Sequence, residues 1–182
     1  MDPEEVLPHE VFPVSPPDFL TTWREVVQDP AGFFATMPES GGLGDPLRFL
    51  AICAAIDAAG TFVVSWGSVI AALAAFLGLI VGSFLLAAAL TLVTQHLFEG
   101  PAGFEPVFRV VAYGSAPAVA FWVPWLAAVP CVYAWYLQVR GVERVQGLDA
   151  LRATVATTVA WVGVWFVVRG LAGYPVGWLG TR

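Results

Sequence analysis

Long apolar runs, separated by short breaks rich in glycine, proline or charge, make up the chain from Leu47 onward. A helix needs about 20 mostly apolar residues to cross the hydrocarbon of a bilayer. The first run, residues 47–98, is long enough for two such helices. Ser65-Trp-Gly-Ser68 predicts the turn between them, because glycine interrupts a helix and tryptophan favours the membrane interface. We therefore expect spans at about residues 47–64 and 69–93.

A second long run, residues 107–139, contains Pro117, Pro124 and Pro130. It can form two short spans, at about 107–122 and 125–139, joined near Trp122 to Trp125; a single kinked helix is the alternative. The last run predicts a span at about 153–171. The pattern therefore predicts an all-α polytopic membrane helix bundle over residues 47–182. It has five transmembrane helices, or four if the kinked helix forms.

Residues 1–46 precede these spans and are acidic. The segment up to Pro17 is rich in proline and predicts an irregular tail. Two short amphipathic helices follow, one after Asp18 and one after Asp29-Pro30, where aspartate can cap a helix start. The apolar residues of the first recur on one helical face: Phe19, Leu20, Trp23, Val26 and Val27. We expect both helices to lie in the membrane interface with their apolar faces toward lipid; the alternative is a cap that packs on the loops of the bundle.

Composition excludes two classes of protein. Of the 182 residues, 58% are hydrophobic and 12% are charged, and the mean hydropathy is +0.76. A soluble globular domain carries roughly a quarter charged residues, and a disordered chain is poor in apolar ones. The lipid bilayer is therefore an expected partner of this chain.

Charge is divided unevenly along the sequence. Residues 1–46 carry nine acids and one base, Arg24, whereas the remainder carries seven arginines and five acids. The acidic region argues against nucleic acid as a partner, because phosphate binding needs a basic face. With five spans, six arginines fall on the side of the N-terminus, and Arg169 and Arg182 fall on the other. The positive-inside rule then predicts a cytoplasmic N-terminus and an external C-terminus.

The sequence contains no recognisable catalytic, phosphate-binding or metal-binding motif. Cys53 and Cys131 lie in apolar runs, where a thiol behaves as a small hydrophobe. His9 and His96 are far apart in the chain and suggest no metal pair. No nucleophile–base set, phosphate-binding loop or zinc motif is present. We therefore expect no catalytic residue, no cofactor and no metal.

Asp57 lies near the middle of the first expected span, where a carboxylate costs a few kcal/mol to insert. It indicates either a group that binds a proton or an ion, or a structural acid that is hydrogen-bonded to a neighbouring helix. Arg109, Tyr113 and Pro117 follow at a spacing of four, which predicts that they share one helical face. They indicate either a polar site or an interfacial arginine, a packing tyrosine and a kink.

Ala74, Gly78 and Gly82 also recur every four residues, on the second expected span. Gly78 and Gly82 match the small-xxx-small pattern with which membrane helices approach one another closely. We expect these residues to pack helices within the chain; a dimer interface is the alternative.

Four segments resemble the Yip domain family of five-span membrane proteins. The first is Trp23-Arg-Glu-Val-Val-Gln-Asp-Pro30 followed by Phe33-Phe34, and the second is Gly100-Pro-Ala-Gly103 after the second span. The third, Arg109-Val-Val-Ala-Tyr113-Gly-Ser-Ala-Pro117, is similar to the family's Tyr-x-x-x-Pro signature, with a further proline at Pro124. The fourth, Gly141 to Gly147 with Leu151-Arg-Ala153, resembles the segment that opens span five, although Gln146 replaces a common histidine. The match covers Trp23 to Leu171.

This resemblance implies five spans with a cytosolic N-terminus and carries over no catalytic residue. In eukaryotes the family acts in vesicle traffic and contacts prenylated small GTPases. The composition of this chain resembles prokaryotic members in the cytoplasmic membrane, so we do not extend the GTPase role to it. We expect a non-catalytic scaffold that organises the membrane, binds membrane proteins or self-associates. The alternative is a transporter or channel-like component with a polar path around Asp57, together with Arg109 and Tyr113.

Overall fold

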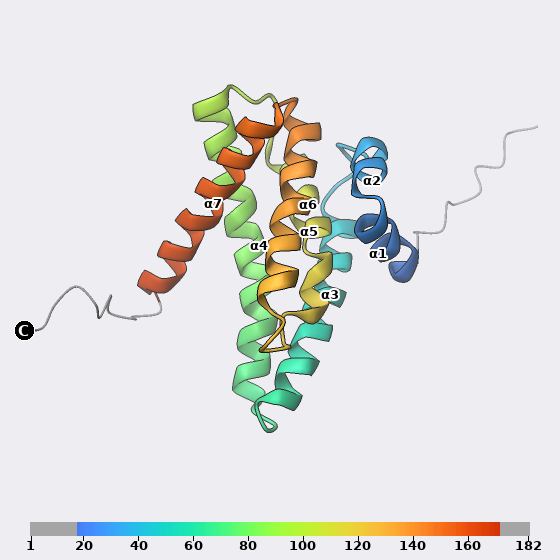
Figure 1. Cartoon of the computed structure of the whole chain (residues 1–182), viewed down its shortest axis with the longest axis vertical. Helices are drawn as coiled ribbons and strands as arrows, with labels where there is room; N and C mark the ends of the chain where they lie inside the picture. Colours follow the sequence, from blue (N-terminus) through green and yellow to red (C-terminus); the bar gives the residue numbers. More distant parts are fainter. Residues whose placement is uncertain (1–17, 172–182) are drawn as a thin grey trace, which may run out of the picture.

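A computed structural model describes residues 18–171, and this range folds into helices without a strand (Figure 1). The helices are α1 (Phe19–Gln28), α2 (Pro30–Thr36), α3 (Gly44–Val64), α4 (Val69–Phe98), α5 (Phe104–Gly114), the 3-10 helix η1 (Ala116–Ala120), α6 (Ala128–Gln146) and α7 (Ala150–Leu171). The expectation of an all-α fold is confirmed for this range. The irregular tail expected before Asp18 and the segment after Leu171 lie outside the described residues.

The first long apolar run, residues 47–98, forms the antiparallel hairpin α3–α4 (Figure 1). Its turn lies where the sequence predicts it, at residues 65–68. Trp66 and Gly67 have φ angles of 57° and 83°, and the Ser68 side chain accepts a hydrogen bond from the Ala71 amide over 3.2 Å. A left-handed backbone followed by a serine cap ends one helix and starts the next. With 30 residues, α4 is about 45 Å long and exceeds the thickness of the hydrocarbon.

The proline-rich run forms a second hairpin, α5–η1–α6, with a turn at residues 121–127. A Cβ on Gly141 would overlap the Val110 side chain, and one on Gly114 would lie 2.7 Å from Cγ of Gln138. These two contacts place α5 and α6 side by side and antiparallel. The alternative of a single kinked helix is therefore wrong.

Three helices are long and apolar enough to cross a membrane among the described residues, namely α3, α4 and α7. The helices at the third and fourth expected spans, α5 and α6, do not meet these criteria of length and hydropathy. Helix α5 has 11 residues, which gives about 16 Å, and α6 carries Arg140, Glu143 and Arg144 toward its end. Five crossings are thus not established by helix length and composition.

Helices α1 and α2 lie on the side of the bundle opposite α7 (Figure 1). Val26 and Phe34 on their inner faces are buried against the bundle, whereas Leu20 remains 55% exposed. The expectation that the apolar faces enter the lipid interface is therefore corrected, and the alternative of a packed cap describes the structure. The bundle gives these side chains a close-packed apolar surface, and it holds a main-chain acceptor in a fixed position for Trp23.

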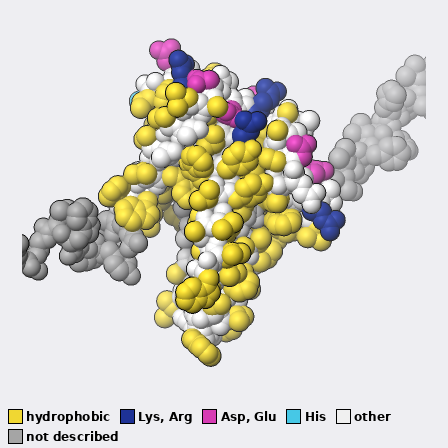
Figure 2. Space-filling model, in the orientation of Figure 1, with side chains coloured by type: hydrophobic (Ala, Val, Ile, Leu, Met, Phe, Trp, Pro, Cys, Tyr) yellow, Lys and Arg dark blue, Asp and Glu magenta, His cyan; other side chains and the backbone are white. Residues whose placement is uncertain are grey.

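Hydrophobic side chains cover the lower part of the molecule, where α3 and α4 turn (Figure 2). Charged side chains on this face gather at the upper end and beside α1 and α2. The sequence has no Asp, Glu, Lys or Arg between Asp57 and Glu99, which leaves the hairpin turn uncharged. Such a division is typical of a bundle whose shaft is immersed in lipid.

Candidate functional site

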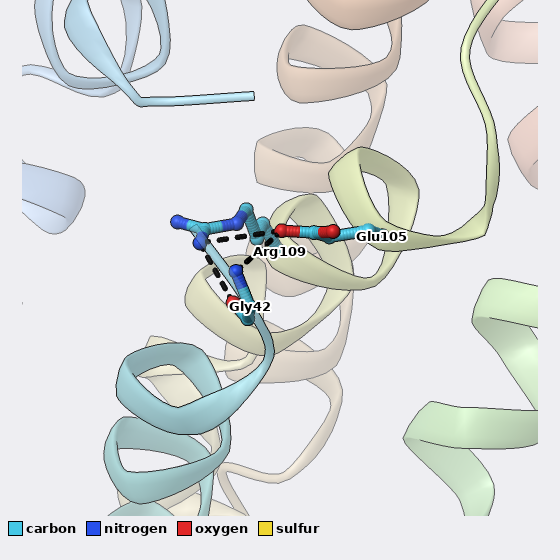
Figure 3. Close-up of polar contacts among 3 residues, drawn as sticks. All are labelled: Gly42, Glu105 and Arg109. Carbon is cyan, nitrogen blue, oxygen red and sulfur yellow. Dashed lines mark hydrogen bonds and ion pairs between the residues drawn. The ribbon is translucent and has the colours of Figure 1, made fainter. Parts of the chain in front are cut away.

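Arg109 holds the linker between α2 and α3 against α5 (Figure 3). Its Nη2 atom donates a hydrogen bond to the Gly42 carbonyl over 2.7 Å and lies 3.6 Å from Oε1 of Glu105. The same Glu105 oxygen accepts a hydrogen bond from the Gly42 amide over 2.7 Å. Glu105 and Arg109 are one helical turn apart, so they bind the amide and the carbonyl of the same residue, Gly42. The arginine is buried, and these contacts offset part of the desolvation of its charge, while its Nε atom has no hydrogen-bond partner among the described residues.

The linker needs glycine at this point. Gly41 and Gly42 have φ angles of 126° and 83°, which side chains rarely allow. A Cβ on Gly41 would also lie 3.1 Å from Nη2 of Arg109. Arg109 and Glu105 thus clamp the glycine-rich segment Glu39-Ser-Gly-Gly-Leu-Gly44.

Tyr113, one turn after Arg109, packs among aromatic rings from the N-terminal helices and α3. Its ring centroid lies 5.1 Å from that of Phe33 and 5.2 Å from that of Phe49. The two contacts join α2 and α3 through one side chain of α5. Aromatic pairs at such tilted geometries contribute about 1 kcal/mol each beyond the area that they bury.

Pro117 does not share a continuous helical face with Arg109 and Tyr113. Helix α5 ends at Gly114, and Pro117 lies within η1. Proline has no amide hydrogen, and its ring clashes with the carbonyl four residues earlier, so the α-helix cannot continue through this position. The expected kink is therefore a complete break.

This break supplies acceptors and neighbours for α1. Trp23 donates its Nε1 hydrogen to the Ala116 carbonyl over 2.9 Å, and Tyr133 of α6 donates its hydroxyl to the Val27 carbonyl over 2.6 Å. Both bonds join residues about 100 positions apart. Arg109, Tyr113 and the break at Pro117 thus form one docking site, the cap clamp, for the N-terminal helices.

Asp57 lies outside the cap clamp, on α3. It is 6% exposed on α3, its carboxyl group lies against the backbone at Trp122, and its Oδ1 atom has no hydrogen-bond partner among the described residues. Gly60, one turn further, accommodates the Trp122 indole, and any Cβ there would overlap the ring. Tyr113 and Asp45 line the same cavity. Asp57 lies twelve residues after Asp45 on α3, which places it about 18 Å further along the helix and away from Tyr113. The fold does not bring Asp57 together with Arg109 and Tyr113.

The small residues of α4 face outward or toward a hollow. Ala74 and Gly78 are exposed, and a Cβ on Gly78 or Gly82 meets no atom within 4 Å. The two glycines border a hollow of about 260 Å³, which Gln138 and Trp161 also line. The chain therefore does not pack a second helix of its own closely against these glycines, and the dimer alternative stays a prediction.

Sequence reasoning did not anticipate a buried amide network around Gln146. Its Nε2 donates to Oγ1 of Thr94 over 2.8 Å, and its Oε1 accepts from the Ala102 amide over 3.0 Å. Gly100 leaves room for this side chain, since a Cβ there would overlap Oε1 of Gln146. A glutamine within an apolar helix is the signal that could have predicted the network, because buried amides need partners.

A second buried glutamine joins the last two helices. Trp161 of α7 donates its Nε1 hydrogen to Oε1 of Gln138 over 2.6 Å. Gln138 is buried beside Gly114, so this contact ties α5, α6 and α7 together. Over residues 18–171, no group of three or more His, Cys, Asp or Glu side chains is placed to hold a metal ion.

These features define a helical integral membrane protein with a packed N-terminal cap. The Yip1 domain family model matches residues 24–171, and the chain belongs to this family. No curated protein and no solved structure shows significant similarity to the chain. In the structure the four segments that resemble the family meet in pairs. Trp23 and Phe33 contact the segment from Arg109 to Pro117, and Gln146 contacts the loop at Gly100.

Proposed function

We propose that this Yip1-domain protein is a non-catalytic scaffold that organises the membrane or holds partner membrane proteins. The observation that supports this most is the cap clamp, which attaches α1 and α2 to the broken helix. Trp23, Tyr133 and Arg109 make three long-range hydrogen bonds to main-chain carbonyls of the partner segments. The protein thus holds two short helices in a defined orientation at its charged end, and no transported solute is needed to explain this arrangement.

The outer face of α1 is the surface that a partner would meet. Its inner residues, Thr22 and Val26, are buried in the bundle. The outer residues are exposed and mix polar, charged and apolar side chains: Leu20, Thr21, Arg24, Glu25 and Gln28. A surface that is already ordered loses less conformational entropy on binding, which favours recognition of a partner.

We also infer five crossings, a cytoplasmic N-terminus and an external C-terminus, in a cytoplasmic membrane of prokaryotic type. Helices α5 and α6 would supply the third and fourth crossings. The uncharged α3–α4 turn supports this orientation, because Arg140, Arg144 and Arg152 lie near the α6–α7 connection instead. Arginine is retained on the cytoplasmic side of membrane proteins.

Site-directed photocrosslinking in native membranes tests the scaffold. A photoreactive residue at Arg24 should give a reproducible crosslink to a membrane protein. The same photoreactive residue in place of Ile70 should not give this crosslink. Ile70 is 82% exposed and lies at the start of α4, beside the α3–α4 turn. The Trp23→Phe variant should weaken the product at Arg24. Equal products at both positions, or none at Arg24, would contradict the scaffold.

Transport is the second candidate, and the buried Asp57 favours it. An acid within a membrane span, with one carboxyl oxygen unpartnered, can bind a proton or an ion. Reconstituted in proteoliposomes, a transporter should show a proton or ion flux that Asp57→Asn abolishes while the protein remains folded. If the wild-type protein shows no flux under any imposed gradient, this candidate is excluded.

A further inference from the structure

Arg48 is a membrane-proximal cation that has no partner in the part of the chain that the structure describes. Within residues 18–171 it makes no ion pair or hydrogen bond, whereas Arg109, Arg140 and Arg152 each pair with a carboxylate. It lies in the second turn of α3, close to the positive end of the helix dipole. A guanidinium group and a helix N-terminus together favour a phosphate group.

A cavity of about 400 Å³ lies beside Arg48, between α1 and α3. Two carboxylates, Asp18 and Asp45, line it, and neither makes an ion pair within the described chain. Phe19, Phe49 and Tyr113 line the same cavity. The ring centroid of Phe49 lies 5.2 Å from that of Phe19 and 5.2 Å from that of Tyr113.

This combination of groups selects for charge. With two acids and one base, the lining carries a net charge of −1, so it disfavours a ligand that is only anionic. A zwitterion with a phosphate and an amine matches it, because the phosphate can meet Arg48 and the amine can meet the carboxylates. Aromatic rings beside the carboxylates further stabilise an ammonium group through cation–π attraction.

An apolar groove continues from this cavity along α3. It is shallow and open to the outside, and it shares Arg48 and Ile52 with the cavity. Ala51, Ala55 and Ala59 form its floor at a spacing of four, and Phe76 of α4 contributes the other side. The small side chains leave room for a flexible chain against the helix.

The dimensions of the groove fit one leaflet. From Arg48 to Ala59 the helix rises about 16 Å, which is about half of the hydrocarbon thickness. The polar cavity lies at the end of α3 where charged side chains gather, and the groove runs toward the uncharged hairpin turn (Figure 2). The polar and the apolar parts therefore follow the order of a phospholipid in the membrane.

The geometry points to a binding site for one zwitterionic, amine-bearing phospholipid. Arg48 binds its phosphate, Asp18 and Asp45 bind its amine beside the aromatic rings, and one acyl chain lies along Ala51, Ala55 and Ala59. This site shares Tyr113 with the cap clamp, but its polar groups, Arg48, Asp18 and Asp45, lie outside the clamp, and it does not depend on a scaffold function. It uses α1 as one wall, so the N-terminal helices complete the cavity.

Native mass spectrometry of the full-length protein in detergent tests the site. Added phosphatidylethanolamine should remain bound as one molecule, with several-fold higher occupancy than phosphatidylglycerol of the same chains. Arg48→Gln should lower this occupancy at least fivefold, and Asp45→Asn should reduce the preference over phosphatidylglycerol. Arg152→Gln, which changes an exposed arginine at the start of α7, should bind as the wild type does.

Two further probes separate the parts of the site. Ala55→Phe should fill the groove and lower retention of the intact lipid, and glycerophosphoethanolamine, which lacks acyl chains, should bind much more weakly than the lipid. A photoreactive phosphatidylethanolamine in nanodiscs should crosslink to residues 44–64 in the wild type, and less in Arg48→Gln. Equal retention of zwitterionic and anionic lipids, no effect of Arg48→Gln, or equal binding of the chain-free compound would overturn the proposal.

Discussion

Trp23 and Ala116 are joined by a 2.9 Å hydrogen bond, from the indole nitrogen of α1 to a main-chain oxygen at the break between α5 and η1. The break exposes a carbonyl that a continuous helix would have used itself. Tryptophan suits this position because its ring packs on apolar neighbours while its one N–H reaches the acceptor. Pro117 interrupts the helix, and Trp23 binds the carbonyl that the interruption exposes, so the two residues act together to attach α1.

Removing this hydrogen bond should loosen the cap. Trp23→Phe retains an aromatic ring but leaves the Ala116 carbonyl without its donor, which should cost about 1 kcal/mol. We expect a lower midpoint of thermal unfolding in detergent and faster proteolysis in the linker at residues 38–43. Trp66→Phe is the matched control, because Trp66 is 97% exposed at the α3–α4 turn. Identical proteolysis of both variants would show that the bond does not hold the cap.

The ion pair of α5, in which Arg109 is buried and the Glu105 side chain is 38% exposed, should be more strongly coupled than a fully exposed pair. Arg109→Ala leaves the Gly42 carbonyl without its donor and removes the positive charge beside Glu105, so we expect a loss of about 1.5–3 kcal/mol of stability. A double-mutant cycle with Glu105→Ala should give a clear interaction energy. The exposed pair of Arg152 and Asp149, 3.2 Å apart, should give between about 0 and 1 kcal/mol in the same cycle. Equal coupling of the two pairs would contradict the clamp.

Gly100 and Gln146 should be coupled through space. Gly100→Ala places a methyl group on the Gln146 side chain, and overpacking of this kind should cost about 1–3 kcal/mol. In a Gln146→Ala background the same substitution should cost much less, because the overlapping oxygen is gone. Thermal unfolding of the wild type, both single variants and the double variant measures this difference. Strictly additive effects would show that the loop moves away from Gln146 instead.

Cysteine labelling tests the number of crossings and their orientation. In a Cys53→Ala, Cys131→Ala background, single cysteines at Ser65, Trp125 and Gly180 should react with an impermeant maleimide from outside. Cysteines at Ser40 and Asp149 should react only after the membrane is opened.

Trp125 is the decisive position, because it lies 96% exposed in the α5–α6 turn and α5 itself is short. Protection of Trp125→Cys, with labelling of Ser65→Cys, would mean that this hairpin enters the membrane without crossing it. Labelling of Ser40→Cys from outside would reverse the orientation.

Several features were accessible from local sequence alone. The helices α1 and α2, the turn at residues 65–68 and the turn at residues 121–127 occur where the sequence predicts them. Asp29 caps α2 as expected, since its side chain accepts a hydrogen bond from the Gly32 amide over 3.0 Å. Apolar runs, caps and helix breakers act within a few residues, so their effect can be read without knowledge of the fold.

The tertiary structure alone decided what these helices contact. The partners of Arg109, Trp23 and Gln146 lie between 44 and 93 positions away in the chain, and no periodicity indicates them. The amphipathic faces of α1 and α2 predicted an apolar neighbour, but lipid and protein satisfy such a face equally well. The choice depended on a broken helix that offered an acceptor at the right distance, and only packing of the whole bundle creates that acceptor.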